Sequence, residues 1–316
     1  MTIAWVLGSG GLLGAALSRT LRRKGTELIS PAERFRWANA TQFAFQLEAA
    51  VQAFAASVRS AERWEIYWAA GVSTMGSSER DLALETRSLA LLLRLVESES
   101  RLVATPGSVA FASSAGAIYA GSPDYLINEN TTPAPTTSYG REKLTQEDLM
   151  RSFADANRGR AVLLARLSTL YGPGQSFGKQ QGLIAHIARC ILRNRPIQIY
   201  VPLDTIRDYI TADDAADAMV AALRVTRAEP GVLTKIIASE QPTTIAEIIS
   251  IFKRIARRAP RIITSASKLT GIYPRRVQFL SLVAPKCAWA PKTSLLVGIA
   301  QVMAAERVAL ARGRGV

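Results

Sequence analysis

Cysteine and histidine are almost absent from this chain of 316 residues. Cys190 and Cys287 are the two cysteines, and His186 is the one histidine. Two distant thiols in no metal-ligand spacing exclude a disulfide framework, argue against a zinc site and suit a reducing compartment. His186 lies in the apolar helical run LIAHIARCI, where we expect a structural role rather than a catalytic one.

Long hydrophobic runs are missing as well. No uninterrupted apolar stretch reaches the roughly 20 residues that a transmembrane helix needs. The apolar stretch TIAWVLGSGGLLGAALS near the N-terminus has no positive charge before it and is interrupted by glycines, unlike a signal peptide. These patterns predict a cytoplasmic protein without a membrane span.

Basic residues are abundant, but aromatic residues do not accompany them. The formal net charge is +14, and the densest basic clusters, at residues 22–24, 257–258 and 275–276, are short. A binding platform for single-stranded nucleic acid combines basic side chains with aromatic rings. We therefore expect no nucleic-acid partner, although a nucleic-acid-binding scaffold stays open as an alternative.

Short apolar runs alternate with longer amphipathic stretches over the first half of the chain. The apolar runs fall at residues 2–7, 26–30, 64–70, 108–114 and 161–166. This alternation predicts an α/β fold, a Rossmann-like doubly wound parallel sheet with helices on both faces. We expect a dinucleotide-binding domain over residues 1–170, with segments near 197–240 returning to it. Residues 171–316 are expected to form mainly a smaller α/β C-terminal lobe that binds substrate.

The glycine-rich stretch GSGGLLG follows the first expected strand and opens the first expected helix. In such a loop Gly8 permits a tight turn, Gly11 lets the backbone approach a pyrophosphate, and Gly14 allows close helix–strand packing. The helix that starts near Leu12 supplies N–H donors and the positive end of its dipole. The pattern predicts that these residues bind NAD or NADP.

The residues after the second expected strand bear on the choice between the two cofactors. An acidic residue there favours NAD, whereas small residues with arginine favour the 2′-phosphate of NADP. Ser30 occupies the expected place, and Arg34 follows beside Glu33. The sequence therefore favours NADP and leaves NAD open.

Two serines and a tyrosine–lysine pair form the candidate catalytic group. Ser113 and Ser114 end the fourth strong expected strand, and Tyr139 and Lys143 share one face of the next helix. A tyrosine pKa of about 10 is too high for a base at neutral pH, but a nearby ammonium favours the phenolate. A serine hydroxyl can hold the substrate oxygen while Tyr139 exchanges its proton.

Motifs along nearly the whole chain resemble those of the extended short-chain dehydrogenases/reductases, in the NAD-dependent epimerase/dehydratase (nucleotide-sugar epimerase) family. The matching stretches are GSGGLLG, WAAG, FASSAGAIY, SYGREK, ARLSTLYGPGQ, IRDYITADDAADAM, TTIAEI and WAPKTSLLVGIA. The resemblance implies that Tyr139 is the general acid or base and that Lys143 anchors the nicotinamide ribose. It further implies that Ser114, or else Ser113, positions the sugar hydroxyl, and that Ala69 and Ala70 line the cofactor.

The resemblance also implies a nucleotide-diphosphate sugar as substrate. The residues expected to contact it are Ser113, Thr169, Lys179, Arg207 and Arg276. Four positions depart from the family pattern, among them Thr169, where many relatives have asparagine, and Ala120, which follows Ile-Tyr where glycine is usual. Ala115 stands where members usually carry the catalytic serine or threonine, and Asn39 replaces an aspartate that commonly caps the third strand and faces adenine. Relatives often dimerise through two-helix faces, so we expect a homodimer.

The residues beside Ser114 narrow the expected reaction. Dehydratase relatives carry an Asp–Glu pair there, whereas this chain has Gly116 and Ala117, which argues against dehydration. What remains is hydride transfer at the sugar C4. We favour a nucleotide-sugar 4-epimerase, and an NADPH-dependent 4-ketoreductase is the alternative. The intact serine, tyrosine and lysine argue against a non-catalytic NADP-binding scaffold.

Overall fold

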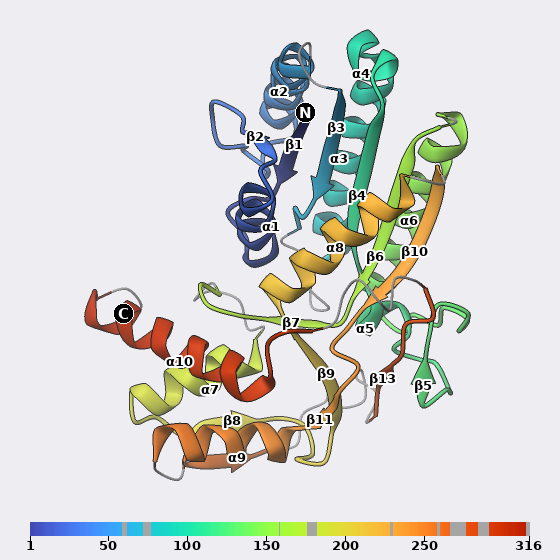
Figure 1. The fold of residues 1–316 in the computed structure, drawn as a ribbon. Helices are drawn as coiled ribbons and strands as arrows, with labels where there is room; N and C mark the ends of the chain where they lie inside the picture. The colour runs from blue at the N-terminus through green and yellow to red at the C-terminus, as the bar shows by residue number, and fades with distance from the viewer. Residues whose placement is uncertain are drawn as a thin grey trace.

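A parallel sheet forms the centre of the larger lobe (Figure 1). The computed structural model describes residues 1–58, 62–71, 77–157, 159–175, 182–227, 230–257, 260–265, 276–283 and 291–313. The sheet strands are β1 (Thr2–Leu7), β2 (Glu27–Ile29), β3 (Arg63–Trp68), β4 (Gly107–Ser114), β6 (Ala161–Leu167) and β10 (Gly231–Ile237). Their order is β10-β6-β4-β3-β1-β2, and all neighbouring pairs are parallel. The Rossmann-like doubly wound sheet is thereby confirmed.

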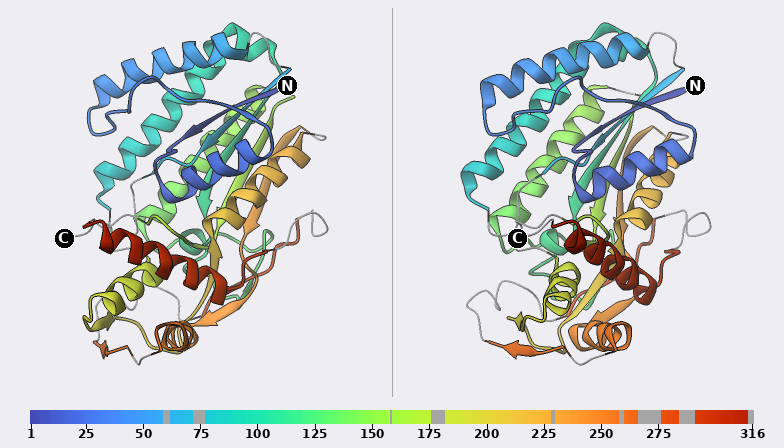
Figure 2. Two further views of the ribbon diagram at one scale, coloured as in Figure 1. Left: turned by 60° about the vertical axis from the view of Figure 1, so that its left-hand side comes forward. Right: turned by 90° about the vertical axis from the view of Figure 1, so that its left-hand side faces the viewer.

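Helices cover both faces of this sheet (Figures 1 and 2). One face carries α1 (Leu12–Arg23) and α8 (Ala212–Thr226). The other face carries α2 (Ala40–Ser57), α3 (Glu79–Ser98), α4 (Ser100–Ala104) and α6 (Ser138–Ala156). Alternate residues of β1 enter the two cores: Ile3, Trp5 and Leu7 join one cluster, and Ala4 and Val6 join the other. Burial on both faces explains why the strands read as continuous apolar runs.

A smaller lobe lies beyond the carboxyl ends of these strands (Figure 1). Its strands are β7 (Thr169–Tyr171), β9 (Ile206–Thr211) and β11 (Pro242–Thr244) in one sheet, with β8 (Ile197–Ile199) paired to β12 (Ile262–Thr264). Its helices are α7 (Leu183–Leu192), α9 (Ile245–Ala256) and α10 (Leu295–Ala311), which enclose a separate apolar cluster. The short elements α5 (Ala115–Ile118), β5 (Leu126–Ile127) and β13 (Gln278–Phe279) complete the described structure.

The chain crosses between the lobes more than once. After β8 and β9 in the smaller lobe, α8 packs against α1, and β10 pairs with β6 at the edge of the main sheet. Within residues 197–240, the return to the main sheet therefore begins at α8. The strands β8 and β9 belong to the smaller lobe.

The segment between β2 and α2 forms no strand, so the expectation that Asn39 ends a third strand was wrong. Asn39 instead caps α2, because its Oδ1 accepts a hydrogen bond from the Gln42 amide at 3.0 Å. Phe35 and Trp37 pack against the core, and the Trp37 and Trp68 rings lie 6.1 Å apart. The packing of these two aromatic side chains against the core holds the segment there as a loop.

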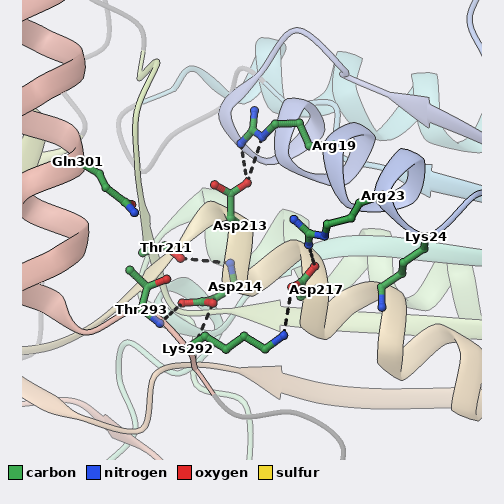
Figure 3. A pocket seen from close by; sticks show the side chains of 10 residues that line it. All are labelled: Arg19, Arg23, Lys24, Thr211, Asp213, Asp214, Asp217, Lys292, Thr293 and Gln301. Atoms are coloured by element: carbon green, nitrogen blue, oxygen red, sulfur yellow. Dashed lines mark hydrogen bonds and ion pairs between the residues drawn. The ribbon is translucent and has the colours of Figure 1, made fainter.

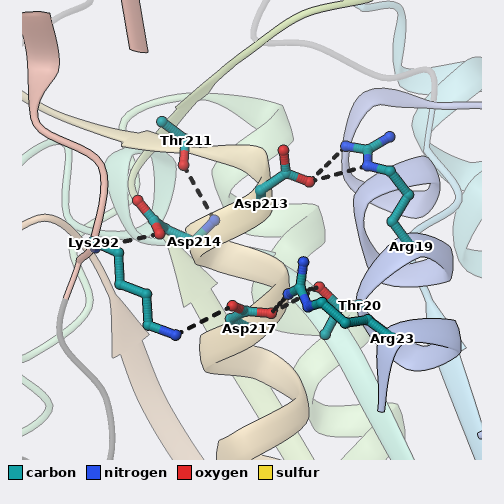
Figure 4. Close-up of polar contacts among 8 residues, drawn as sticks. All are labelled: Arg19, Thr20, Arg23, Thr211, Asp213, Asp214, Asp217 and Lys292. Atoms are coloured by element: carbon teal, nitrogen blue, oxygen red, sulfur yellow. Dashed lines mark hydrogen bonds and ion pairs between the residues drawn. The ribbon is translucent and has the colours of Figure 1, made fainter. Parts of the chain in front are cut away.

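Charged side chains line a pocket between α1, α8 and the segment that precedes α10 (Figure 3). Arg19 pairs with Asp213 at 2.6 Å, which ties α1 to the start of α8 (Figure 4). The Asp214 carboxylate accepts hydrogen bonds from the backbone amides of Lys292 and Thr293 at 3.3 and 3.1 Å. The start of α10 is therefore held to α8, and through α8 the smaller lobe is held to the main sheet.

Candidate active site

The glycine loop after β1 packs tightly against the end of β3 and against itself. Gly8 has φ of 87°, and a Cβ added there would lie 2.6 Å from the Ala69 backbone. A Cβ on Gly14 would lie 2.0 Å from the Gly8 carbonyl oxygen. Only glycine fits both positions, so the loop and the start of α1 can lie in close contact beside β3.

The outer side of this loop fits a dinucleotide pyrophosphate. Gly11 is the exposed N-cap of α1, no side chain caps that helix end, and its first turn, which starts at Leu12, carries no acidic residue. The first N–H groups of the helix therefore remain available, and the positive end of the helix dipole is not neutralised. A Cβ at Gly10 would meet no heavy atom within 4 Å, so the loop borders open space.

Replacing Gly14 with alanine is expected to destabilise the protein by about 1–3 kcal/mol, the usual cost of overpacking, and to weaken cofactor binding. The reason is the 2.0 Å approach to the Gly8 oxygen, which forces loop and helix apart. Gly10→Ala is the matched control, because its Cβ enters open space. Urea unfolding measures both variants. Equal stability of the two variants would contradict the packing described for this loop.

The other predicted cofactor residues follow β2 and β3. The Ala69 amide donates to the Leu7 carbonyl at 2.9 Å, and Ala69 and Ala70 are both half-buried beside the glycine loop. Ser30 and Arg34 are exposed after β2. Ser30, Ala69 and Ala70 therefore border the same edge of the sheet as the glycine loop, whereas the Arg34 carbonyl accepts from Gln46 of α2 at 3.2 Å.

The predicted catalytic residues meet at the carboxyl end of β4. Ser114 is its last residue, and Tyr139 lies in the first turn of α6. Thr137 caps this helix by accepting from the Gly140 amide at 3.1 Å. A Cβ on Gly140 would lie 2.6 Å from the Ala117 carbonyl oxygen, so glycine after Tyr139 lets α6 begin directly against α5.

The surroundings of Tyr139 keep its phenol protonated at neutral pH. Burial raises the Tyr139 pKa above its usual value, and the Lys143 ammonium lowers it. The Glu85 carboxylate raises the pKa again, and a hydrogen bond with Ser114 lowers it, which leaves a net increase. Tyr139 is thus ready to donate a proton, and it needs further positive charge nearby before it can accept one.

Lys143 has an ionic partner that the sequence analysis missed. Its Nζ donates to Glu85 Oε1 at 3.0 Å and to Gln146 Oε1 at 2.9 Å, and it lies 5.6 Å from the Tyr139 ring centre. Burial lowers the Lys143 pKa, but Tyr139 and Glu85 outweigh burial and raise it. The ammonium therefore stays charged.

The two neighbouring serines have different partners. Ser113 is buried, and its Oγ donates to Glu147 Oε1 at 2.7 Å. Glu147 also accepts two hydrogen bonds from the buried Arg166, at 2.9 and 2.6 Å. Ser114 instead lies close enough to Tyr139 to lower the pKa of its phenol. The geometry favours Ser114 over Ser113 as the residue that contacts substrate.

The predicted substrate residues lie on and beside β9. Thr169 pairs with Tyr209 on the neighbouring strand, and Arg207 comes two residues before Tyr209. Because alternate residues of a strand share a face, Thr169 and Arg207 lie on one face of this small sheet. Arg276 forms an isolated β-bridge with Ile206 of β9, the residue that precedes Arg207. Lys179 lies outside the described residues.

Two kinds of feature are absent from the described ranges. No helix there is both long enough and apolar enough to cross a membrane. The same residues contain no group of three or more His, Cys, Asp or Glu side chains placed to hold a metal ion. His186 and Cys190 lie one turn apart on α7, with 3.6 Å between Nε2 and Sγ.

Comparison with known proteins identifies related sequences. The model of the NAD dependent epimerase/dehydratase family matches residues 4–234. A dTDP-L-rhamnose 4-epimerase from Burkholderia thailandensis is 33% identical over 178 residues, which cover 55% of this chain and 47% of that protein. A dTDP-4-dehydro-6-deoxyglucose reductase from Escherichia coli is 34% identical over 115 residues, or 36% of each chain. These matches span less than half the length of either relative.

Solved structures share the fold over nearly the whole chain. A UDP-glucose 4-epimerase from Bifidobacterium longum, in complex with NAD+ and UDP, aligns with a TM-score of 0.78, at 17% identity, over 100% of both chains. The RMD protein from Pseudomonas aeruginosa, complexed with NADPH, aligns with a TM-score of 0.73, at 19% identity, over 97% of this chain and 100% of the other. Structures of this fold thus bind either cofactor.

Proposed function

The chain belongs to the NAD-dependent epimerase/dehydratase family, and we propose that it is a nucleotide-sugar 4-epimerase that uses NAD or NADP. The observation that carries this proposal is the cluster of Ser114, Tyr139 and Lys143 at the end of β4. It lies at the sheet edge where the glycine loop follows β1, the edge at which doubly wound sheets bind their ligands. Similarity to a rhamnose 4-epimerase supports the same reaction class.

In the proposed reaction, Tyr139 takes and returns the proton of the C4 hydroxyl. As the phenolate removes this proton, the hydrogen on C4 leaves as hydride, and Tyr139 gives the proton back when the hydride returns to the opposite face. When bound, the nicotinamide supplies the hydride acceptor and donor. The Lys143 ammonium stabilises the phenolate, and the Ser114 hydroxyl donates a hydrogen bond to the reacting oxygen. The proton and the hydride both return to the sugar, so the product has the substrate's mass.

The residues after Ser114 support epimerisation over dehydration. Elimination of water across two carbons requires an acid and a base beside the reacting serine. Gly116 and Ala117 occupy those positions, and a Cβ on Gly116 would meet no atom within 4 Å. Neither residue can transfer a proton, so the reaction is proposed to end with the sugar's hydroxyl groups all retained.

A nucleotide-diphosphate sugar is the proposed substrate. Arg207 shares a sheet face with Thr169, and Arg276 bridges to the same strand. Guanidinium groups suit a diphosphate because they pair with its oxygens through several N–H donors. We assign the diphosphate to the two arginines and the sugar to Thr169 and Ser114; Lys179, which is also expected to contact the substrate, lies outside the described residues.

An NADPH-dependent 4-ketoreductase is the second candidate, and the residues after β2 favour it. Ser30 and the exposed Arg34 are a small residue and a cation, the combination that favours the 2′-phosphate of NADP. A reductase draws on the soluble NADPH pool, whereas an epimerase regenerates its own cofactor. The similarity to a reductase from Escherichia coli is compatible with this alternative.

Bound cofactor and product mass distinguish the two candidates. Purified protein is analysed by mass spectrometry for retained NAD or NADP and is then incubated with UDP-, dTDP- and GDP-hexoses. An epimerase is expected to retain oxidised cofactor and to yield a product of unchanged mass that separates by chromatography. A reductase is expected to consume NADPH only when a keto-sugar is supplied. Failure in both assays would reject both proposals.

A further inference from the structure

A buried carboxylate lies beside the candidate catalytic lysine. Glu85 projects from α3, its side chain is 8% exposed, and its Oε1 lies 3.0 Å from the Nζ of Lys143, whose side chain is 6% exposed. Its other oxygen, Oε2, is buried and has no hydrogen-bond partner within the part of the chain that is described. A Cβ at Gly71, just beyond β3, would lie 3.0 Å from Oε1. The carboxylate thus sits under the sheet edge that carries Ala69 and Ala70.

Lys143 is held from several sides. Its Nζ also donates to Gln146 Oε1 at 2.9 Å and lies 5.0 Å from the Phe111 ring centre. We infer that Glu85 is a positioning residue of this site: it holds the Lys143 ammonium and sets the pH at which Tyr139 exchanges its proton. This inference rests on the proposed role of Tyr139 as proton donor and acceptor.

Other titratable groups near the start and inner face of α6 have partners of their own. They include Glu79 on α3, which accepts from Ser138 at 3.4 Å, Glu142 and Glu147 on α6 itself, Tyr119 on α5, Arg166 on β6 and Lys235 on β10. Arg166 pairs with Glu147 at 2.6 Å and donates to the Tyr119 hydroxyl. Glu142 accepts from Thr86, and Lys235 donates to Ser281 at 2.9 Å. The strand β4 faces the site with uncharged residues only.

Within the described residues, Glu85 is therefore the carboxylate set directly against both Lys143 and Tyr139. Its negative charge opposes formation of the phenolate, so it keeps the proton on Tyr139 to a higher pH. The same charge pairs with the ammonium that would otherwise favour the phenolate. The buried pair thus holds Lys143 close to Tyr139 while limiting how acidic the phenol becomes.

Glu85→Gln tests this inference, because it keeps the side-chain shape and an acceptor for Lys143 but removes the charge. The Tyr139 pKa then falls, so the Tyr139-dependent limb of the kcat/KM profile is expected to move to lower pH by roughly 1–2 units. In an epimerase the shift is expected on the rising limb, because Tyr139 must lose its proton to act as the base. In a reductase it is expected on the falling limb, because Tyr139 must keep its proton to act as the acid. Glu97→Gln, an exposed carboxylate on the same helix, is the matched control and should leave the profile unchanged. An unmoved limb in folded Glu85→Gln overturns the inference.

A measurement without turnover separates this inference from the proposed function. The ring resonance of isotope-labelled Tyr139, assigned by its loss in Tyr139→Phe, is titrated in wild type and in Glu85→Gln. A lower titration pH in the variant supports the inference even if no nucleotide sugar is converted, and an equal titration pH rejects it. If Glu85→Gln does not fold, Glu85→Asp keeps the charge but draws it back from Lys143. That variant is expected to lower kcat about tenfold, while the Tyr139-dependent limb of the kcat/KM profile stays at the same pH. An unchanged kcat rejects the positioning role.

Discussion

A Tyr139→Phe variant is expected to convert nucleotide sugars about 10³-fold more slowly than the wild type while it binds the cofactor normally. Phenylalanine keeps the aromatic ring, which lies 5.6 Å from the Lys143 ammonium, but it removes the group that carries the proton. No other residue in the proposed mechanism can take up and return that proton, since Ser114 is far too weak an acid and the Lys143 ammonium, paired with Glu85 at 3.0 Å, has no lone pair to accept one. Steady-state turnover and the mass of retained cofactor measure the two effects separately.

Tyr200→Phe is the control for this experiment. Tyr200 follows β8 in the smaller lobe and is 50% exposed, so loss of its hydroxyl should leave turnover and cofactor binding unchanged. If Tyr139→Phe retains more than about a tenth of wild-type turnover, the phenol is not the acid or base, because general acid–base catalysis contributes at least about 10²-fold. If the variant also loses the cofactor, its defect lies in binding rather than in proton transfer.

The sheet was predictable because its strands are buried on both faces. Apolar runs such as residues 2–7 and 108–114 coincide with β1 and β4, and their alternate residues feed two separate cores. The position of Asn39 was not predictable from the family pattern, since the segment before it forms no strand and its Phe35 and Trp37 instead pack against one of those cores. Burial of these two rings holds that segment, and Trp5 and Trp68, two of the rings they contact, are distant in the sequence.

The glycine loop and Tyr139 could be proposed because their patterns are local. Glu85 could have been suspected, because it occupies a core position of α3: Leu82, Glu85, Leu89 and Leu92 follow helical spacing, and all four are buried. Its partner was hidden, since Lys143 lies 58 residues further along the chain. A charged residue at a core position signals a buried pair without naming the other member.

The choice between Ser113 and Ser114 depended on which helix covers which face of β4. Ser113 shares its face with Val109 and Phe111, which belong to the core under α6, and there it meets Glu147. Sequence analysis could place both serines at the end of a strand, but strand periodicity alone does not say which face turns towards α6. That information came from the packing.

A Glu147→Leu variant is expected to lose about 3–5 kcal/mol of unfolding free energy, because it leaves the Arg166 guanidinium buried without its counter-charge. Glu147 is fully buried and accepts from Arg166 at 2.9 and 2.6 Å, from Ser113 at 2.7 Å and from Arg151 at 3.1 Å, so four hydrogen bonds are lost together. Urea unfolding measures the loss. Asp148→Asn is the control: its side chain is 73% exposed, and its pair with Arg151 is expected to contribute less than about 1 kcal/mol.

The double variant Glu147→Leu with Arg166→Met is expected to recover most of that stability, since two apolar side chains replace the buried pair without an orphaned charge. A double variant as unstable as the single one would contradict this explanation and assign the loss to packing. Recovery would mean that the fold does not require the Glu147–Arg166 pair. The buried pair would instead serve the end of β4. Glu147 accepts a hydrogen bond from Ser113 and so holds that side chain inward. The next residue, Ser114, then lies beside Tyr139.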